Sequence, residues 1–140
     1  MAGYSGTPLW KKLGYKSGLR AYLDAAPADY VQLLELPPDV QVAWLDKKES
    51  NIRFVHLFER NGRALRTKLG SYRKKMASDG VIWVSWPKKG SGVATDINEG
   101  TLREAALPLG LVDIKVCAVD EVWSALKLVI RRENRRQIPQ

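Results

Sequence analysis

The sequence has one cysteine and one histidine among its 140 residues. A single cysteine excludes a disulfide within the chain and a cysteine-rich zinc site, and a single histidine excludes any site that needs two imidazoles. No apolar run approaches the about 18 residues of a membrane-spanning helix, and residues 1–12 lack the apolar core of a signal peptide. We therefore expect a soluble, cytoplasmic protein without a metal ion.

The length fits a single folded domain. Apolar residues make up 45% of the chain and charged residues 27%, which is typical of a globular protein rather than a disordered one. A chain of this length buries about two-thirds of its unfolded surface, so it needs no disulfide or metal to fold. We divide it into an N-terminal arm (1–18), one folded domain (19–133) and a basic C-terminal tail (134–140).

The positive charge is concentrated in one segment. The formal net charge is +8, and residues 47–89 hold 12 Lys and Arg against 3 Asp and Glu. A basic face attracts anions such as nucleic acid, phosphorylated metabolites, acidic proteins or acidic lipids. The alternative is a solvated helix face that only keeps the protein soluble.

The apolar residues recur with two different periods. From Leu65 to Met76 they fall on one helical stripe, and Asn61 can cap the start of that helix. A nearly continuous apolar run such as VIWVSW (81–86) is typical of a strand buried on both faces. Helices are predicted over 63–77 and 99–107, and a short helix begins at Pro27. Strands are predicted over 19–25, 40–46, 52–59, 81–86, 111–119 and 124–132.

Strands that alternate with single helices indicate a parallel sheet with helices on both faces. The link between the last two strands, at Asp120-Glu121, is too short for a crossover, so these strands should pair antiparallel. The predicted fold class is α/β, a single three-layer Rossmann-like domain. Its sheet is mostly parallel, has about six strands and ends in a C-terminal antiparallel hairpin.

Several motifs carry a resemblance to known families. The stretch MASDGVIWVSWPK (76–88) is similar to the helix, glycine turn and fifth strand of class I methyltransferases, and residues 95–133 are similar to their last helix and closing hairpin. One of the usual seven strands is missing, between Asp46 and Ile52. Five further motifs are GTPLWKKLG (6–14), VIWVSWPKK (81–89), VATDINE (93–99), REAALPLGLVD (103–113) and VCAVDEVWSALKLV (116–129). Through them the chain resembles a bacterial family of uncharacterised proteins, domain-of-unknown-function family 3052, which implies no activity.

The methyltransferase resemblance implies S-adenosylmethionine at the turn from the first strand into the first helix. Glycines at that turn normally let backbone amides approach the cofactor. Here the turn is DAAPADY (24–30), which has no glycine and loses one amide donor at Pro27. Asp46, at the end of the second strand, stands where an acidic residue would bind ribose hydroxyls. The incomplete turn leads us to expect no bound cofactor.

In open α/β sheets, ligands bind outside the carboxyl ends of the strands. The most distinctive segment there is Ser85 to Lys89, because its tryptophan can stack on a planar ring and its two lysines can pair with an anion. The structural alternative is that Trp86 caps the core, Pro87 ends the strand and the lysines are solvated. The candidate ligand-binding residues are Asp24, Asp46, Ser85, Trp86, Lys88, Lys89, Thr95 and Asp96.

The remaining candidates are weaker. His56 lies in the middle of a strand and is interpreted as a packed core residue, and Cys117 as a buried, inert thiol. The candidate anion-binding residues on the basic helix are Arg63, Arg66, Arg73 and Lys74. Four arginines near the C-terminus could extend this patch or only keep the tail soluble: Arg131, Arg132, Arg135 and Arg136.

Three functions remain open. The first is a non-catalytic, methyltransferase-like binding module that uses the basic segment 47–89 for an anionic ligand or acidic partner. Nucleic acid is possible, although no known reader motif is visible and the only aromatic residue of the basic helix, Tyr72, lies on its apolar stripe. The second is a small S-adenosylmethionine-dependent methyltransferase with an atypical turn. The third is a protein-interaction subunit, and no oligomeric state follows from the sequence.

Overall fold

The structure is a computed structural model that describes residues 6–137. Its core is one sheet of six strands in the order β2-β1-β3-β4-β6-β5. In chain order the elements are α1 (Leu9–Leu13), β1 (Arg20–Asp24), α2 (Tyr30–Leu34), β2 (Ala43–Trp44), β3 (Ile52–Phe58), α3 (Gly62–Lys75), β4 (Met76–Pro87), α4 (Glu99–Ala106), β5 (Leu111–Ala118) and β6 (Trp123–Ile130), with short 3-10 helices at Lys89–Ser91, Leu107–Leu109 and Arg132–Gln137.

The sheet has the predicted mixture of parallel and antiparallel pairs. Strands β2, β1, β3 and β4 are parallel to one another. Strand β6 runs antiparallel to β4, and β5 runs antiparallel to β6. The predicted mostly parallel sheet with a C-terminal antiparallel hairpin is therefore confirmed.

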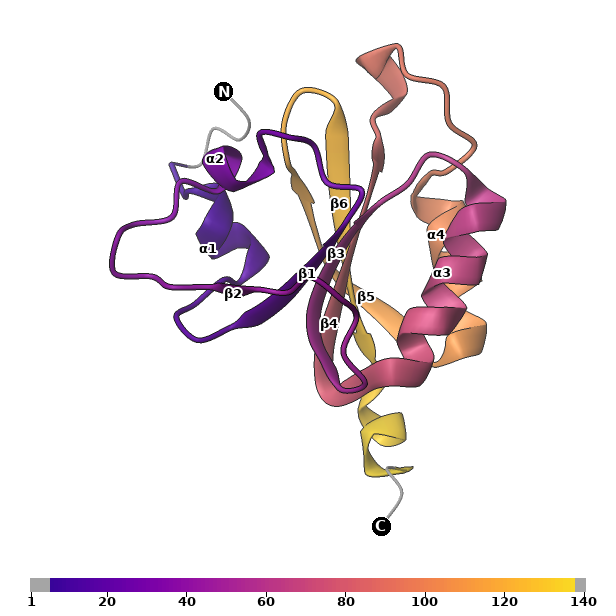
Figure 1. Ribbon diagram of the computed structural model, residues 1–140. Coiled ribbons are helices and arrows are strands. Elements are labelled where there is room, and N and C mark those ends of the chain that lie inside the picture. Colours follow the sequence, from indigo (N-terminus) through magenta and orange to yellow (C-terminus); the bar gives the residue numbers. More distant parts are fainter. Residues whose placement is uncertain (1–5, 138–140) are drawn as a thin grey trace.

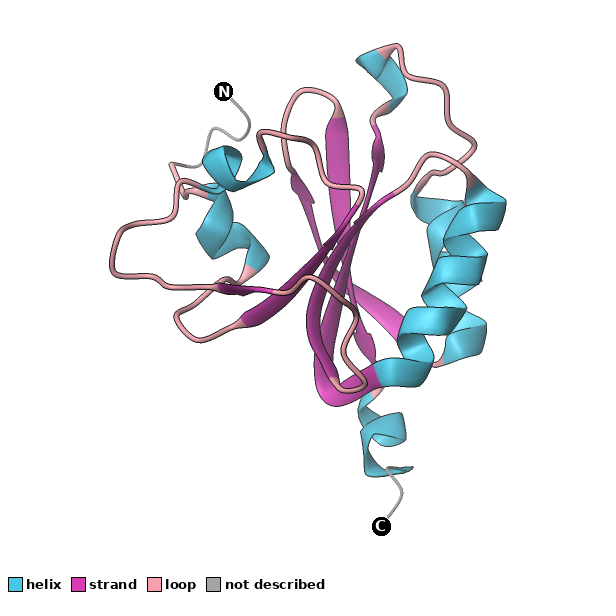
Figure 2. Ribbon diagram, in the orientation of Figure 1, coloured by secondary structure: helices cyan, strands magenta, loops and turns pink. Residues whose placement is uncertain are grey.

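Helices cover both faces of the sheet, which makes the predicted three layers (Figure 1). Helices α1 and α2 pack on one face, where Leu13 and Leu34 are fully buried. Helices α3 and α4 pack on the other face through Leu65, Leu69 and Leu102. The colouring of Figure 2 shows the sheet between the two pairs of helices.

Residues 9–15, part of the segment expected as an arm, pack on the sheet. Leu13 of α1 is completely buried, and its backbone oxygen accepts a hydrogen bond of 2.8 Å from the indole nitrogen of Trp83. Tyr15 is also buried in the same cluster. Residues 9–15 therefore contribute to the core, and the division of the chain into arm, domain and tail otherwise stays a prediction.

Two strands differ in length from the prediction. Strand β2 has only two residues in place of the expected 40–46, and it lies at the edge of the sheet, where Trp44 is 37% exposed. Strand β4 begins at Met76 rather than 81, because Met76 already pairs with Ile52 of β3. No helix among the described residues is long and apolar enough to cross a membrane.

Candidate functional site

The carboxyl end of β4 and the segment that follows it line a pocket of about 540 Å³. Its lining residues come from the end of β4, the 3-10 helix at Lys89–Ser91 and the loop that leads into α4, and Figure 1 shows these segments in the upper right of the molecule. This pocket brings together residues that the sequence placed at a common edge: Trp86, Lys88, Lys89, Thr95 and Asp96.

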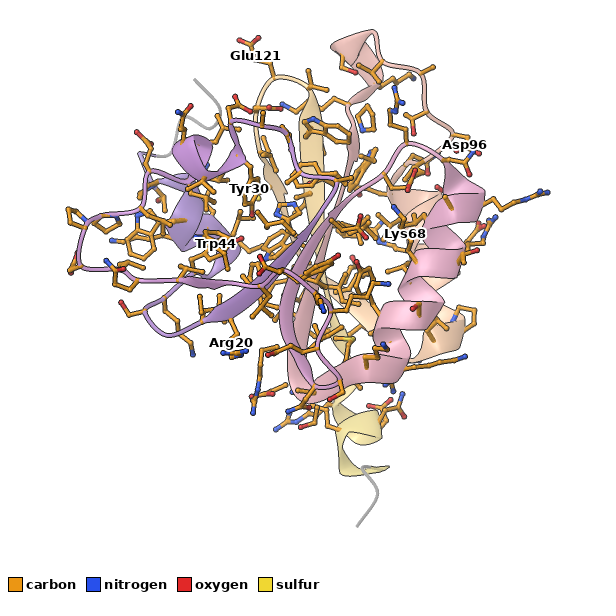
Figure 3. The ribbon with its side chains drawn as sticks, in the orientation of Figure 1. Arg20, Tyr30, Trp44, Lys68, Asp96 and Glu121 are labelled. Carbon is orange, nitrogen blue, oxygen red and sulfur yellow. The ribbon has the colours of Figure 1, made fainter. Side chains whose placement is uncertain are left out.

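Most polar groups of this pocket hold the loop together. The Lys88 ammonium donates a 2.6 Å hydrogen bond to the backbone oxygen of Asp120, and the Thr95 hydroxyl donates one to the backbone oxygen of Arg60. The Asp96 carboxylate accepts a 2.7 Å hydrogen bond from the Gly62 amide, at the first turn of α3 (Figure 3). A carboxylate at a helix N-terminus is stabilised by the helix dipole, so these contacts explain the loop without a ligand.

Ser85 does not line this pocket, and Trp86 reaches it from the core. Ser85 is fully buried, and its hydroxyl lies 2.7 Å from Nε2 of His56. Trp86 is only 6% exposed and packs in the cluster under α3 and α4. The sequence suggested both as ligand-binding residues, with the alternative that Trp86 caps the core, and both side chains are buried in the structure.

Asp24 lies apart from that pocket, in a compact group of charged and polar side chains. Its carboxylate accepts a 2.5 Å hydrogen bond from the Tyr72 hydroxyl and lies 3.4 Å from the Lys68 ammonium. The same ammonium lies 3.0 Å from Glu59, and Figure 3 shows Lys68 between α3 and the sheet. The second predicted carboxylate, Asp46, is exposed and has no hydrogen bond or ion pair within the described residues.

The pKa values of this group follow from its pairing. For Glu59, burial acts to raise the pKa, but two backbone amides and Lys68 outweigh it and hold the pKa below its usual value. For Lys68, burial acts to lower the pKa, and the two carboxylates raise it instead. Burial and the neighbouring Asp24 both raise the pKa of Tyr72. The group is therefore a closed ionic network at neutral pH, with Tyr72 protonated.

The sequence predicted structural roles for His56 and Cys117. His56 is completely buried, and burial lowers its pKa to about 3. Cys117 is half-buried, and burial raises the pKa of its thiol, which keeps the less reactive protonated form. Within the described residues there is no group of three or more metal-ligating His, Cys, Asp or Glu side chains.

A second pocket, of about 520 Å³, lies at the opposite end of the sheet, where α3 ends and β4 begins. We call it the basic pocket, because four cationic side chains line it against one carboxylate, that of Asp79. The four cations are Arg53, Arg73, Lys74 and Arg135. Of the four C-terminal arginines that the sequence offered as an extension of the basic patch, Arg135 lines this pocket.

Backbone contacts fix two of these guanidinium groups. The Nε of Arg73 donates a hydrogen bond of 2.8 Å to the backbone oxygen of Leu109. The Nε of Arg135 donates one of 2.9 Å to the backbone oxygen of Ile130. In the described part of the chain, the terminal nitrogens of both groups have no hydrogen-bond partner. Each group is held in position with its outer donors available, which is how arginine binds phosphate or carboxylate.

The candidate anion-binding residues of α3 therefore divide into two pairs. Arg73 and Lys74 line the basic pocket, whereas Arg63 and Arg66 line none of the three pockets described for residues 6–137. Sequence reasoning did not select Arg53, although this residue lies within the basic segment. The reason is that Arg53 belongs to β3, whose apolar pattern predicts a core strand.

Comparison with solved structures identifies the fold. A Burkholderia thailandensis 1,6-didemethyltoxoflavin-N1-methyltransferase has a TM-score of 0.55 at 14% identity, over 88% of this chain and 75% of that one. The structure of LepI in complex with SAM has a TM-score of 0.53 at 13% identity, over 89% of this chain. A protein of the NADB-Rossmann superfamily from Streptococcus agalactiae has a TM-score of 0.53 at 12% identity, over 99% of this chain and 76% of that one.

These likenesses establish a methyltransferase-like, Rossmann-like fold and nothing finer, because the identities are low. The chain spans 47% of the length of LepI. No curated protein matches the sequence. A family model for a protein of unknown function, DUF3052, matches residues 42–132, which confirms the resemblance carried by the four motifs between 81 and 129; the motif at 6–14 lies outside the match. The chain belongs to the DUF3052 family.

Proposed function

We propose that this protein is a non-catalytic binding module with a methyltransferase-like fold, and that its basic pocket binds phosphate-type anions. The observation that carries the proposal is the set of four cations around one concave space, with Arg73 and Arg135 held by their Nε atoms. Preoriented guanidinium groups lose little freedom on binding, which favours a planar or tetrahedral anion with several acceptor oxygens.

The structural relatives suggest S-adenosylmethionine as an alternative ligand, and the residues of this chain do not fit it. The turn after β1 has no glycine, and Ala25 takes a positive φ of 60° there. The Asp24 carboxylate is already engaged by Tyr72 and Lys68. Helix α2 has only five residues and lacks a side-chain cap, so it offers little of the dipole that helps bind a cofactor. We derive no methyl transfer from this site.

Calorimetric titration with pyrophosphate at low salt tests the proposal. We expect the wild type to bind and the double variant Arg53→Gln/Lys74→Gln to bind at least tenfold more weakly. Each lost charge contact is worth about 1 kcal/mol at an exposed site, or about fivefold in affinity. Arg63→Gln/Arg66→Gln is the matched control, because it removes the same charge at two exposed positions of α3 away from the pocket. Absence of wild-type binding, or an equal loss in the control, would refute the proposal.

A further inference from the structure

A third pocket, of about 350 Å³, adjoins the basic pocket. Both pockets are lined by Arg53 and Asp79, so the two spaces share a wall. The additional cations of this third pocket are Lys16, Arg20 and Lys127. We call the two adjoining spaces together the basic furrow. Figure 3 shows Arg20 at the end of the sheet where β1 begins, opposite the end that carries Asp96.

The furrow gathers charge from distant parts of the sequence. Among the described residues, seven cationic side chains line it, and they come from the turn before β1 and from β1, β3, α3, β6 and the C-terminal 3-10 helix. Asp79 is the only carboxylate that these residues bring to the two linings. A concave surface with charge of one sign focuses its field and raises the local concentration of a long anion.

The shared wall is itself an ion pair. One terminal nitrogen of Arg53 lies 2.8 and 2.9 Å from the two oxygens of Asp79, and both side chains are exposed. Arg20 is likewise paired with Glu49, outside the furrow lining. An exposed pair of this kind is weak, so a ligand phosphate can compete for the arginine.

Neutral groups lie beside the cations throughout the furrow. Asn51 and Ser78 line the basic pocket, and Ser17, Gly18 and Leu19 line the adjoining one. A ligand with closely and evenly spaced negative charges would place one of them beside the Asp79 carboxylate, which would repel it. A ligand whose phosphates alternate with neutral, hydroxylated units would match the alternation of cations and neutral groups.

From these observations we infer that the basic furrow binds the phosphodiester backbone of a single-stranded nucleic acid. The inference rests on the proposed function and extends it to the ligand class. A concave groove tracks a flexible strand, whereas duplex readers present a protruding helix or ribbon to the major groove. The furrow residues include no exposed aromatic ring, so binding should depend on the backbone and show little base preference.

Fluorescence anisotropy with labelled oligonucleotides of about 3 and about 12 nucleotides tests this inference. The double variant Lys16→Gln/Lys127→Gln removes charge from the adjoining pocket only. We expect it to weaken binding of the long oligonucleotide at least fivefold and to leave pyrophosphate binding unchanged. The slope of log affinity against log salt should fall by about 0.7 for each lost phosphate contact. Arg63→Gln/Arg66→Gln, with the same charge change outside the furrow, is the control.

The outcomes separate the two proposals. In one outcome, the Lys16→Gln/Lys127→Gln protein binds pyrophosphate and keeps the oligonucleotide affinity and salt slope of the wild type. That result would refute nucleic-acid binding by the basic furrow but not anion binding by the basic pocket. Tighter binding of a duplex or of inorganic polyphosphate than of the single strand would also overturn the inference. If the wild type does not bind pyrophosphate, the proposed function itself is refuted.

Discussion

Four buried side chains form a continuous hydrogen-bonded chain on the face of the sheet covered by α1 and α2. The hydroxyls of Tyr15 and Tyr30 lie 2.7 Å apart, the Tyr30 hydroxyl lies 2.7 Å from Nδ1 of His56, and Nε2 lies 2.7 Å from the Ser85 hydroxyl. A neutral imidazole has one donor and one acceptor nitrogen, which suits a chain with hydroxyls on both sides. Among the described residues no buried side-chain nitrogen or oxygen lacks a partner.

The histidine in this chain should stay neutral well below pH 6. Burial lowers the pKa of His56 to about 3, and the groups around it, Tyr30, Phe58, Trp83 and Ser85, carry no charge. The unfolded chain binds a proton near pH 6.5, so the folded state loses stability as the pH falls from about 6.5 toward 3. Between pH 7 and pH 5 we expect a loss of about 2 kcal/mol in the free energy of unfolding from this group.

Because the sequence has only one histidine, NMR can follow this imidazole without ambiguity. The ring resonances should not titrate between pH 8 and pH 5, and urea unfolding at the two ends should show the stability loss. A ring that titrates near pH 6.5 in the folded protein would contradict the buried neutral state.

Ser85→Ala should destabilise the protein by about 1–3 kcal/mol, because it leaves Nε2 of His56 buried without a partner. Urea unfolding at pH 7 measures this change. Ser50→Ala, at an exposed position, is the control and should change stability by less than about 0.5 kcal/mol. An equally small effect of Ser85→Ala would mean that the hydrogen bond to His56 is not needed.

At the scale of residues, the sequence predicted that His56 is a core residue, but it placed Ser85 among the candidate ligand-binding residues. The apolar neighbours of His56 make burial predictable. The role of Ser85 depends on Tyr30, which reaches the sheet from α2, and no local pattern connects these three positions. The same limit applies to Arg53 and Arg135, which meet in space at the basic pocket.

At the scale of elements, the local signals at the starts of α3 and α4 were reliable, whereas the short helix predicted from Pro27 begins only at Tyr30. Asn61 accepts a 2.9 Å hydrogen bond from the Ala64 amide at the start of α3, as predicted. Asn98 and Thr101 form a reciprocal capping box at the start of α4. The predicted turn at Gly80 is different, because the chain is already extended there and belongs to β4. Its glycine is needed for a close approach to β3 rather than for a turn.

Gly80→Ala should destabilise the protein, whereas Gly70→Ala should stabilise it. A Cβ at Gly80 would lie 2.5 Å from the backbone oxygen of Ile52, so β3 and β4 would have to separate. Gly70 lies inside α3 with nothing within 4 Å of a Cβ, and alanine there should add about 0.5–1 kcal/mol.

Thermal unfolding of the two glycine variants tests this pair of predictions. The melting temperature should fall by several degrees for Gly80→Ala and rise by several degrees for Gly70→Ala. A stable Gly80→Ala protein would show that the two strands tolerate more separation than the structure indicates.

At the scale of the whole molecule, the fold divides the basic segment 47–89 between different surfaces. Arg53, Arg73 and Lys74 reach the basic pocket, whereas Lys68 pairs with Asp24 and Glu59 near the carboxyl ends of the strands. Arg135 joins the pocket from outside the segment. The sequence could therefore predict the charge surplus and the fold class, but not which cations converge, because that depends on the ends of separated strands.

We propose that the ligand site of this protein lies at the amino end of the parallel strands, away from the position that the turn after β1 would give it. The most direct test is an NMR titration of backbone amides with pyrophosphate and, separately, with S-adenosylmethionine. Pyrophosphate should shift amides around the basic pocket, such as those of Asn51, Ala77, Asp79 and Asn134, and S-adenosylmethionine should shift none. Shifts at residues 24–30, or any saturable response to S-adenosylmethionine, would contradict the claim.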